Sequence, residues 1–204
     1  MIDVVQKTGD TELSVLRALF RRANKWMLLM WRLGLGRFLA SPVAGYIMVL
    51  TTTGHKTGLR RRAPVNFEQE GRTVYCLAGF GKSTHWYRNL LANPHCEVWL
   101  PNGWWAGVAE TVSDPGEKLR LLRRVLIRSG FAARLLEGVD PAALSDEDVQ
   151  KLDRGYEVVR IRLVAERSGP GGPGDLAWVW PALGLSLLCV VGVARRVRRR
   201  GGDA

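Results

Sequence analysis

The chain has 204 residues, which is enough for one domain with a hydrophobic core and some additional segments. Its 47% hydrophobic content and eight Trp exclude an intrinsically disordered chain. The net charge of +11 predicts an anionic partner, such as an acidic cofactor, an acidic membrane surface or nucleic acid.

The first predicted element is a helix over residues 11–33, where apolar residues recur at helical spacing. Trp26 and Trp31 flank this apolar face, and Arg and Lys occupy much of the remaining surface. The pattern is typical of a helix that lies on an anionic membrane. A helix packed on the main domain, with solvated arginines, is an equal alternative. We assign residues 1–40 to this basic amphipathic N-terminal unit.

A β-rich domain is predicted over residues 41–167. Its strand-like runs are residues 46–52, 62–68, 72–79, 95–100, 104–112 and 156–165. Glu70-Gly71 and Asn102-Gly103 are hairpin signals that join neighbouring strands. Tight turns between strands, with few helices, predict a mainly antiparallel (α+β) barrel rather than parallel βαβ units.

Three helical segments are predicted to flank this barrel. Ser83 or Thr84 can cap a short helix that ends at Leu91, and Pro115 begins a basic helix over residues 115–128. Short helices are expected within residues 130–151. Cys76 and Cys96 fall in strand-like runs, and the cysteines lack the C-x-x-C spacing of a zinc site, so we expect no metal and a reducing, cytosolic setting.

The connection between the first two strands, residues 51–64, has an unusual composition. It contains four Thr, His55 and four cations, together with Gly54 and Gly58. Glycine lets the backbone approach a ligand closely, and hydroxyl groups and Arg forks favour anionic oxygens. The segment therefore predicts a site for phosphate or carboxylate groups, with a solvated basic turn as an equal alternative.

The last part of the chain has the composition of a membrane anchor. Residues 168–175 are a Gly/Pro-rich linker, and residues 176–204 are an apolar stretch followed by an Arg-rich tail. The 19 residues from 176 to 194 contain Ser186 as their one polar residue, and as a helix they would span about 28 Å. Trp178 and Trp180 would mark one interface. We expect a single C-terminal membrane helix and a barrel on the cytoplasmic side of the cell membrane, although the positive-inside tendency of the tail favours the opposite orientation. A buried core helix is the alternative.

Two blocks of sequence are recognisable together. They are Thr51-Thr52-Thr53-Gly54-His55-Lys56-Thr57-Gly58, followed by Arg61, and Trp86-Tyr87-Arg88-Asn89-Leu90-Leu91-Ala92-Asn93-Pro94. In this order and spacing they resemble the deazaflavin (coenzyme F420)-dependent nitroreductase and quinone reductase family of split β-barrel oxidoreductases. The resemblance covers roughly residues 20–165 and implies a split β-barrel of the FMN-binding type, to which the C-terminal transmembrane-type helix would be an addition.

The resemblance also implies a cofactor site. Reduced coenzyme F420 would carry the hydride, so no catalytic side chain is assigned, and the protein would hold the ring and the acidic tail of the cofactor. The implied cofactor-binding residues are His55, Lys56, Thr57 and Arg61 for the phosphate and tail, Arg62, Ala63, Pro64, Val65 and Asn66 for the ring, Leu77, Ala78, Gly79 and Phe80 for the next wall, and Trp86, Tyr87, Arg88 and Asn89 at a helix start. Packing is an alternative role for Trp86 and Tyr87, and capping or bracing of the turn that follows is one for Asn89.

Some positions depart from the family pattern. His55 stands where Arg is expected, and Asn66 stands where some relatives have an aromatic residue. The Tyr-rich segment that covers the substrate in nitro-reducing members is replaced by Gly130-Phe131-Ala132-Ala133-Arg134. The acceptor is therefore left open by the resemblance.

These observations predict a membrane-associated F420H2-dependent oxidoreductase that acts on a hydrophobic acceptor such as a quinone or a nitroaromatic, in contact with anionic lipid. An FMN-binding split-barrel reductase is one alternative, and a non-catalytic, membrane-tethered anion-binding module is another. No recognition helix, zinc finger or RNP-like pattern supports nucleic acid as a partner. The sequence does not indicate an oligomeric state.

Overall fold

The computed structural model describes residues 22–41, 45–129, 155–186 and 188. Three predicted features fall partly or wholly outside these residues: the beginning of the N-terminal helix, the short helices within residues 130–151, and the Arg-rich tail. Residues 22–32 are helical, as predicted for this part of the N-terminal helix, and Gly34, with φ of +81°, follows it.

Six antiparallel strands close into a barrel. They are β2 (Gly45–Thr53), β3 (Arg60–Glu70), β4 (Thr73–Ala78), β5 (His95–Leu100), β6 (Gly103–Thr111) and β7 (Glu157–Glu166). Their order in the sheet is β2-β3-β4-β7-β6-β5, and β5 pairs again with β2 to close the ring. A further two-residue strand, β1 (Ala40–Ser41), pairs with the beginning of β2. The predicted antiparallel barrel is confirmed, and each predicted strand boundary lies within two residues of the observed one.

Strand alternation separates two hydrophobic clusters. Met48 and Leu50 of β2 point into the barrel, where they join Phe67 of β3 and other buried side chains. Val49, between them, points outward and packs in a second cluster with Trp99, Trp104 and Trp31 of the N-terminal helix. The N-terminal helix is therefore packed against the outside of the barrel through Trp31, which is 2% exposed.

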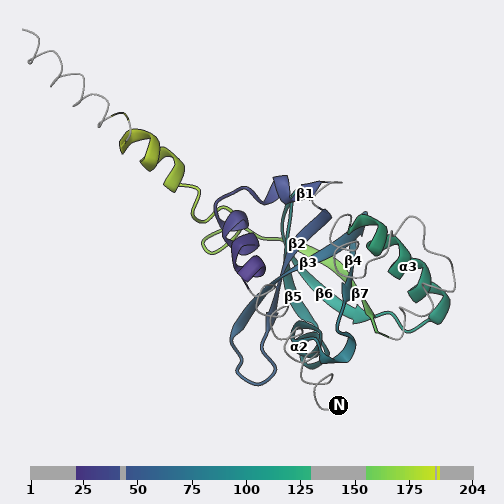
Figure 1. Ribbon diagram of the computed structural model, residues 1–204. Coiled ribbons are helices and arrows are strands. Elements are labelled where there is room, and N and C mark those ends of the chain that lie inside the picture. The colour runs from purple at the N-terminus through teal and green to yellow at the C-terminus, as the bar shows by residue number, and fades with distance from the viewer. Residues whose placement is uncertain (1–21, 42–44, 130–154, 187, 189–204) are drawn as a thin grey trace, which may run out of the picture.

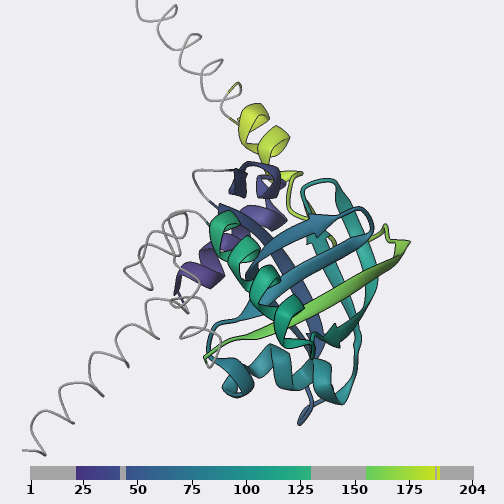
Figure 2. The ribbon, with the colours of Figure 1, turned by 90° about the vertical axis from the view of Figure 1, so that its right-hand side faces the viewer.

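Two helices cover other parts of the barrel (Figure 2). The first, α2 (His85–Ala92), lies at one end and directly follows the 3-10 turn η2 (Gly81–Ser83). The second, α3 (Pro115–Arg128), lies across the strands and buries Leu121, Leu122, Val125 and Leu126 against Tyr75 and Val158. Asp114 caps α3 by accepting a hydrogen bond from the backbone N–H of Glu117, which explains why the helix begins at Pro115.

Helix α3 is also held by a group of ion pairs on β3. Glu68 is 7% exposed and accepts from both Arg124 (2.9 Å) and Arg128 (2.7 Å) of the helix. Arg124 also pairs with Glu70 at the end of β3. A buried carboxylate needs such partners, so this group has a structural role.

The Gly/Pro-rich residues that were predicted as a linker pack against the outside of the barrel. We call residues 168–178 the C-terminal strap. It contains no helix or strand, as its composition predicts, but Gly172 lies so close to Trp104 that an added Cβ would be 2.6 Å from the indole ring. Gly174 N–H donates to Trp31 O (2.9 Å), and Asp175 accepts from Arg32 at 2.9 to 3.2 Å. Glycine makes this close approach possible because it has no side chain.

A helix over residues 179–186 follows the strap and projects away from the barrel (Figure 1). Trp180 Nε1 donates to Leu33 O (2.9 Å), which ties the start of this helix to the end of the N-terminal one. In the described parts of the chain, no helix is long and apolar enough to cross a membrane. The predicted span of residues 176–194 extends past the described residues.

Candidate functional site

The hairpin of β2 and β3 reaches past both of its neighbours in the barrel (Figure 1). On one side, β2 pairs with β5 from Val49 to Thr51, and the pairing ends there. On the other side, β3 pairs with β4 from Phe67 to Glu70. The tip of the hairpin and residues 60–66 of β3 therefore have open backbone edges, as far as the described strands show, and such edges can bind a ligand.

Two glycines shape the turn at the tip of this hairpin. Gly54 N–H donates to Leu59 O (2.8 Å), and its carbonyl accepts from Thr57 N–H (3.1 Å) and Gly58 N–H (2.8 Å). An added Cβ on Gly54 would lie 2.8 Å from Thr57 Oγ1, and Gly58 has φ of +66°. Gly58 thus needs glycine for its backbone conformation, and a side chain at Gly54 would displace that of Thr57. The turn presents Lys56 to solvent.

Lys56 and Arg61 are the exposed cations of this hairpin that remain without an ionic partner among the described residues. Arg61 pairs in register with Thr52, so these two side chains share one face of the hairpin. Unpaired guanidinium and ammonium groups on one hairpin favour the binding of an anion. The arrangement fits the prediction that both residues contact an acidic ligand.

Asn89 of α2 fixes the hairpin in place. Its side chain is buried, and its Oδ1 accepts from His55 N–H (3.0 Å) and from His55 Nδ1 (2.7 Å), while its Nδ2 donates to Thr52 Oγ1 (3.0 Å). Because an amide oxygen can only accept, His55 carries a proton on Nδ1 and presents Nε2 outward. The Asn89 side chain therefore positions the β2–β3 loop, whereas the alternative role considered for it was to brace the turn that follows α2.

The neighbours of Arg61 face the other way. Arg60 forms an ion pair with Glu97 of β5. Arg62 donates to Gly171 O of the strap (2.7 Å) and lies over the Trp99 ring, 4.7 Å from its centroid. Desolvation by burial lowers the pKa of Arg62 below its usual value, and the charge of Arg60 adds to this effect. The side chain of Arg62 is thus committed to the outer face, and its backbone groups are what remain for the predicted ring site.

The other residues predicted for the ring site fall into separate groups. Val65, Ala78 and Tyr87 belong to one buried cluster, against which Ala63 and Trp86 pack. Leu77 packs instead against the cluster beneath α3. Pro64 and Asn66 are half-buried, and Gly79 and Phe80 are exposed where β4 ends. The structure therefore brings parts of β3, the end of β4 and the start of α2 together, and it places Leu77 apart from them.

The start of α2 contributes mainly packing. Tyr87 is 3% exposed, and its hydroxyl shares a hydrogen bond with Thr111 Oγ1 (3.1 Å). Trp86 contacts the Tyr87 ring edge to face. Arg88 is exposed and donates to Lys82 O (2.9 Å). Thr84 occupies the N-cap position as predicted, but its side chain makes no cap hydrogen bond, and its Oγ1 is buried without a partner.

Sequence reasoning missed two parts of this site. It did not single out Thr52 as the anchor for Asn89, and it did not predict that the Arg62 side chain faces the opposite side of the sheet from Arg61. The two-residue period of a strand could have predicted the second point, because successive side chains of β3 must face opposite sides of the sheet. Among the described residues, no group of His, Cys, Asp and Glu could hold a metal ion.

Comparisons with solved structures give distant likenesses. The chain is similar to a putative 5-nitroimidazole antibiotic resistance protein from Bacteroides thetaiotaomicron, with 17% identity over 60% of this chain and 75% of that chain and a TM-score of 0.45. It is also similar to a conserved hypothetical protein from Mycobacterium tuberculosis, with 18% identity over 59% of this chain and 74% of that chain and a TM-score of 0.44. A structure described as an F420-H2 dependent reductase shares 23% identity over 57% of this chain and 93% of that chain, with a TM-score of 0.38.

A family described as F420H(2)-dependent quinone reductase matches residues 24–133, which is more than half of the 204 residues. The matched segment contains the hairpin, Asn89, and all the strands of the barrel except β7. The chain therefore belongs to the F420H(2)-dependent quinone reductase family, and it is an oxidoreductase whose cofactor is coenzyme F420.

Proposed function

We propose that the protein is a membrane-associated reductase that passes a hydride from reduced coenzyme F420 to a hydrophobic, quinone-like acceptor. The observation that carries the proposal is the projecting hairpin, where Lys56 and Arg61 have no ionic partner among the described residues and β3 has a free backbone edge over residues 60–66. Free cations beside an unpaired strand edge suit a redox carrier with an acidic tail.

The residues present fit such a cofactor. Lys56, Arg61 and the outward Nε2 of His55 would hold its phosphate and tail, and the open edge of β3 at residues 63–66 would contact its ring. Bound there, the cofactor supplies the hydride. The role of the protein is then to bind and orient it, with Asn89 holding the loop in the binding position.

An exposed apolar side chain at the end of β4 supports a hydrophobic acceptor. Phe80 is 62% exposed there, and it follows Ala78, which belongs to the buried cluster of the predicted ring site. Exposed apolar side chains beside a ring-binding site favour a flat, apolar second substrate over a charged one. A quinone has this chemistry, and a nitroaromatic is the alternative acceptor.

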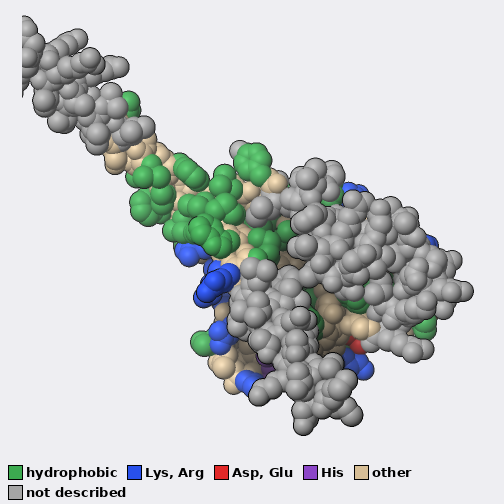
Figure 3. All heavy atoms as spheres, in the orientation of Figure 1, with side chains coloured by type: hydrophobic (Ala, Val, Ile, Leu, Met, Phe, Trp, Pro, Cys, Tyr) green, Lys and Arg blue, Asp and Glu red, His purple; other side chains and the backbone are tan. Residues whose placement is uncertain are grey.

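A second surface supports membrane association. Trp26 (64% exposed), Trp178 (65%), Trp180 (48%) and Leu183 (58%) leave large apolar side chains in solvent. Figure 3 shows hydrophobic side chains over the base of the C-terminal helix, with Lys and Arg side chains beside them. Aromatic residues with neighbouring cations are typical of a surface that rests on anionic lipid. Residues 1–40 and 176–204 would thus attach the barrel of residues 41–167 to the cytoplasmic side of the membrane.

One assay tests the reaction. The purified full-length chain is mixed with reduced F420 and menadione, and deazaflavin reoxidation is followed by fluorescence, with and without vesicles that contain anionic lipid. We expect turnover, and faster turnover when the quinone is supplied in vesicles. No turnover beside an active control enzyme, or tighter binding of FMN than of F420, would contradict the proposal.

A further inference from the structure

The N-terminal helix and the C-terminal strap are in direct contact on one side of the barrel. Gly34, which follows the N-terminal helix, lies so close to Gly174 of the strap that an added Cβ would be 3.9 Å from Gly174 Cα. Two backbone hydrogen bonds of 2.9 Å join the same segments, from Gly174 N–H to Trp31 O and from Leu176 N–H to Arg32 O. The strap therefore ties the C-terminal helix that follows it to the N-terminal helix.

Both segments also pack on one aromatic cluster of the barrel. Trp31 of the N-terminal helix and Trp104 of β6 belong to this cluster, and Gly172 of the strap lies against the Trp104 ring. Arg62 of β3 holds the strap as well, because it donates to Gly171 O (2.7 Å). These contacts fix the N-terminal helix and the strap relative to each other and to the barrel.

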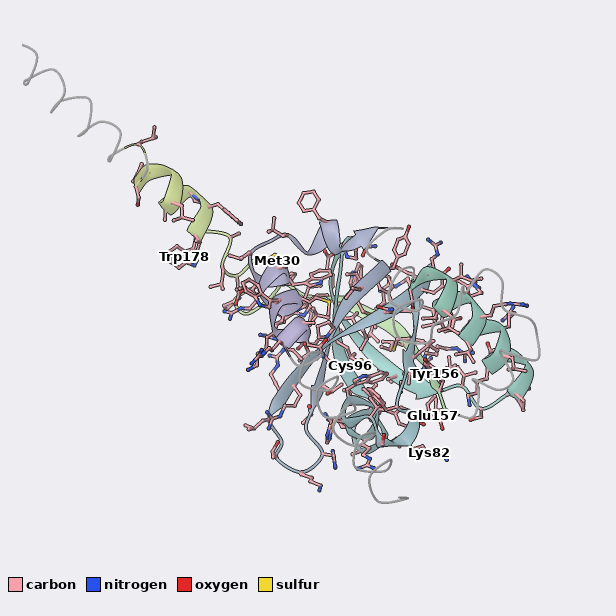
Figure 4. The ribbon with its side chains drawn as sticks, in the orientation of Figure 1. Met30, Lys82, Cys96, Tyr156, Glu157 and Trp178 are labelled. Carbon is pink, nitrogen blue, oxygen red and sulfur yellow. The ribbon has the colours of Figure 1, made fainter. Side chains whose placement is uncertain are left out.

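The outer side of the two segments exposes aromatic, aliphatic and basic side chains together. We call residues 22–34 and 174–186 the joint surface. Its exposed members include Arg22, Lys25, Trp26, Trp178, Trp180 and Leu183. Figure 4 labels Met30 and Trp178, one from each half of the joint surface, on the same side of the barrel. Asp175 is the one carboxylate within these two ranges and is paired with Arg32, so the charges left exposed are positive.

The chemistry of the joint surface matches an anionic bilayer. Indole rings beside cations suit the boundary between lipid headgroups and acyl chains, and Arg22 and Lys25 complement anionic headgroups. The sequence also continues from Ser186 with apolar residues as far as Ala194, and an Arg cluster follows. The apolar character of the joint surface is therefore continuous with the segment that comes next along the chain.

We propose that the joint surface binds an anionic bilayer as one preassembled unit, so that the two ends of the chain attach cooperatively rather than as separate anchors. The proposal rests on the membrane attachment in the proposed function, and it adds that the strap makes each end depend on the other. Two segments that are already fixed together lose less freedom on binding than two independent ones. Undocking the strap should therefore weaken membrane binding, although every lipid-facing side chain is still present.

Gly172→Leu tests this dependence. Because a Cβ at residue 172 would lie 2.6 Å from the Trp104 ring, a side chain there displaces the strap. Full-length wild type and variant are compared by flotation with vesicles of phosphatidylcholine and phosphatidylglycerol. We expect the variant to partition about tenfold more weakly, even though the added Leu is apolar. Ser168→Leu adds the same side chain at an exposed position of the strap and should keep wild-type partitioning.

Asp175→Arg tests the same contact by charge. It places a like charge beside Arg32 and makes the chain more positive, which by itself would strengthen attraction to anionic lipid. The proposal predicts weaker partitioning instead. Glu166→Arg makes the same charge reversal at an exposed position of β7 and should bind the vesicles more tightly than the wild type. Circular dichroism of each variant verifies that the barrel is folded.

Proteolysis on vesicles shows whether the strap stays docked in the bound state. We expect vesicles to slow the cleavage of the wild-type chain within residues 168–178, because lipid holds both halves of the joint surface. Faster cleavage on vesicles would mean that lipid lifts the strap, and this would overturn the proposal. If Gly172→Leu and Asp175→Arg both partition like the wild type, the two ends bind independently and the proposal is also wrong.

Two further outcomes separate the proposal from its alternatives. If the wild type does not bind the vesicles at all, the membrane attachment in the proposed function fails together with the joint surface. If sedimentation shows a dimer in solution that Trp178→Ser dissociates, and vesicles do not compete with it, the surface binds a second copy of the chain and its assignment to lipid is overturned.

Discussion

The two faces of the hairpin use the same residue type for different purposes. Three consecutive arginines, Arg60 to Arg62, alternate across β3. Arg61 faces the side of α2 and has no ionic partner among the described residues, whereas Arg60 pairs with Glu97 and Arg62 is held by Gly171 O and the Trp99 ring. The strand period thus places Arg61 on one face of the sheet, where it is available for the proposed ligand, and Arg60 and Arg62 on the other face, where each has a partner within the protein.

The way the two faces are held also differs. On the side of α2, the loop is fixed by a neutral amide, Asn89, so the nearby cations stay available. On the outer face, a carboxylate, an indole ring and the C-terminal strap hold the cations directly. The predictions below test this division, beginning with the largest effect.

Removing both free cations should have the largest effect on the cofactor. We expect the double variant Lys56→Gln/Arg61→Gln to weaken F420 binding about 100-fold or more at low salt, since each charge-assisted hydrogen bond contributes about 1.5 to 3 kcal/mol. Fluorescence titration at several salt concentrations measures this, and the wild-type affinity should fall more steeply with salt than that of the variant. The control is Lys25→Gln/Arg162→Gln, which removes the same charge elsewhere. Equal affinities in the two double variants would refute the site.

Asn89→Ala should destabilise the protein by about 1 to 3 kcal/mol, because His55 and Thr52 lose a buried partner. Urea unfolding measures this loss, with Asn102→Ala in an exposed turn as the control. A structural role alone would leave the imidazole unchanged, so a second measurement is needed. In NMR spectra the Nδ1–H form of His55 should dominate in the wild type and be lost in the variant. A retained Nδ1–H tautomer would show that Asn89 does not set it.

Alkaline conditions test whether water is excluded from the barrel interior around Cys96 and Cys76. Burial raises the pKa of Cys96 from 9.0 to about 12, and it raises the pKa of Cys76 further. Because the folded-state pKa lies above the unfolded one, the stability that the neutral thiol provides is complete below pH 9 and is lost as the pH rises above it. Between pH 9 and 11, Cys96→Ala should lose stability less steeply than the wild type, by about 1.4 kcal/mol per pH unit. Parallel slopes in urea unfolding would mean that Cys96 is hydrated.

The ion pair between Arg32 and Asp175 should have the smallest effect, since it is partly exposed. We expect Asp175→Asn to cost about 0.5 to 1 kcal/mol of stability. The variant should be cleaved within residues 168–178 by a nonspecific protease faster than the wild type, because the strap is held less firmly. The exchanged pair Arg32→Asp/Asp175→Arg should restore resistance in part. If the wild-type strap is cleaved as fast as that of Asp175→Asn, the strap is not docked by this pair.

Much of the fold could be predicted because local signals agree with the tertiary structure. Asp114 and Pro115 define the start of α3, and Glu70-Gly71 defines a hairpin whose Gly71 has φ of +57°. The strap was harder to predict, since its glycines indicate flexibility in isolation. What holds it is a set of contacts distant in sequence, such as that between Arg62 and Gly171. Long-range contacts of this kind cannot be derived from composition or spacing.

Local sequence patterns also predicted the candidate site only in part. The motif at residues 51–58 predicted an anion site, and the structure leaves Lys56 and Arg61 free there. The roles of Asn89 and Arg62 depend on the elements that pack against them. These neighbours are brought there by the closure of the barrel, which the local sequence does not show. Such roles become visible when the partners are known, because a hydrogen bond needs both its donor and its acceptor.

The most direct test of the division between the two faces compares Arg61→Ala with Arg62→Ala, the same substitution at adjacent residues. F420 affinity and melting temperature are measured for both variants and for the wild type. We predict that Arg61→Ala lowers the affinity at an unchanged melting temperature, whereas Arg62→Ala lowers the melting temperature and keeps the affinity of the folded protein. The reverse pattern, or equal losses of affinity in both variants, would contradict the account.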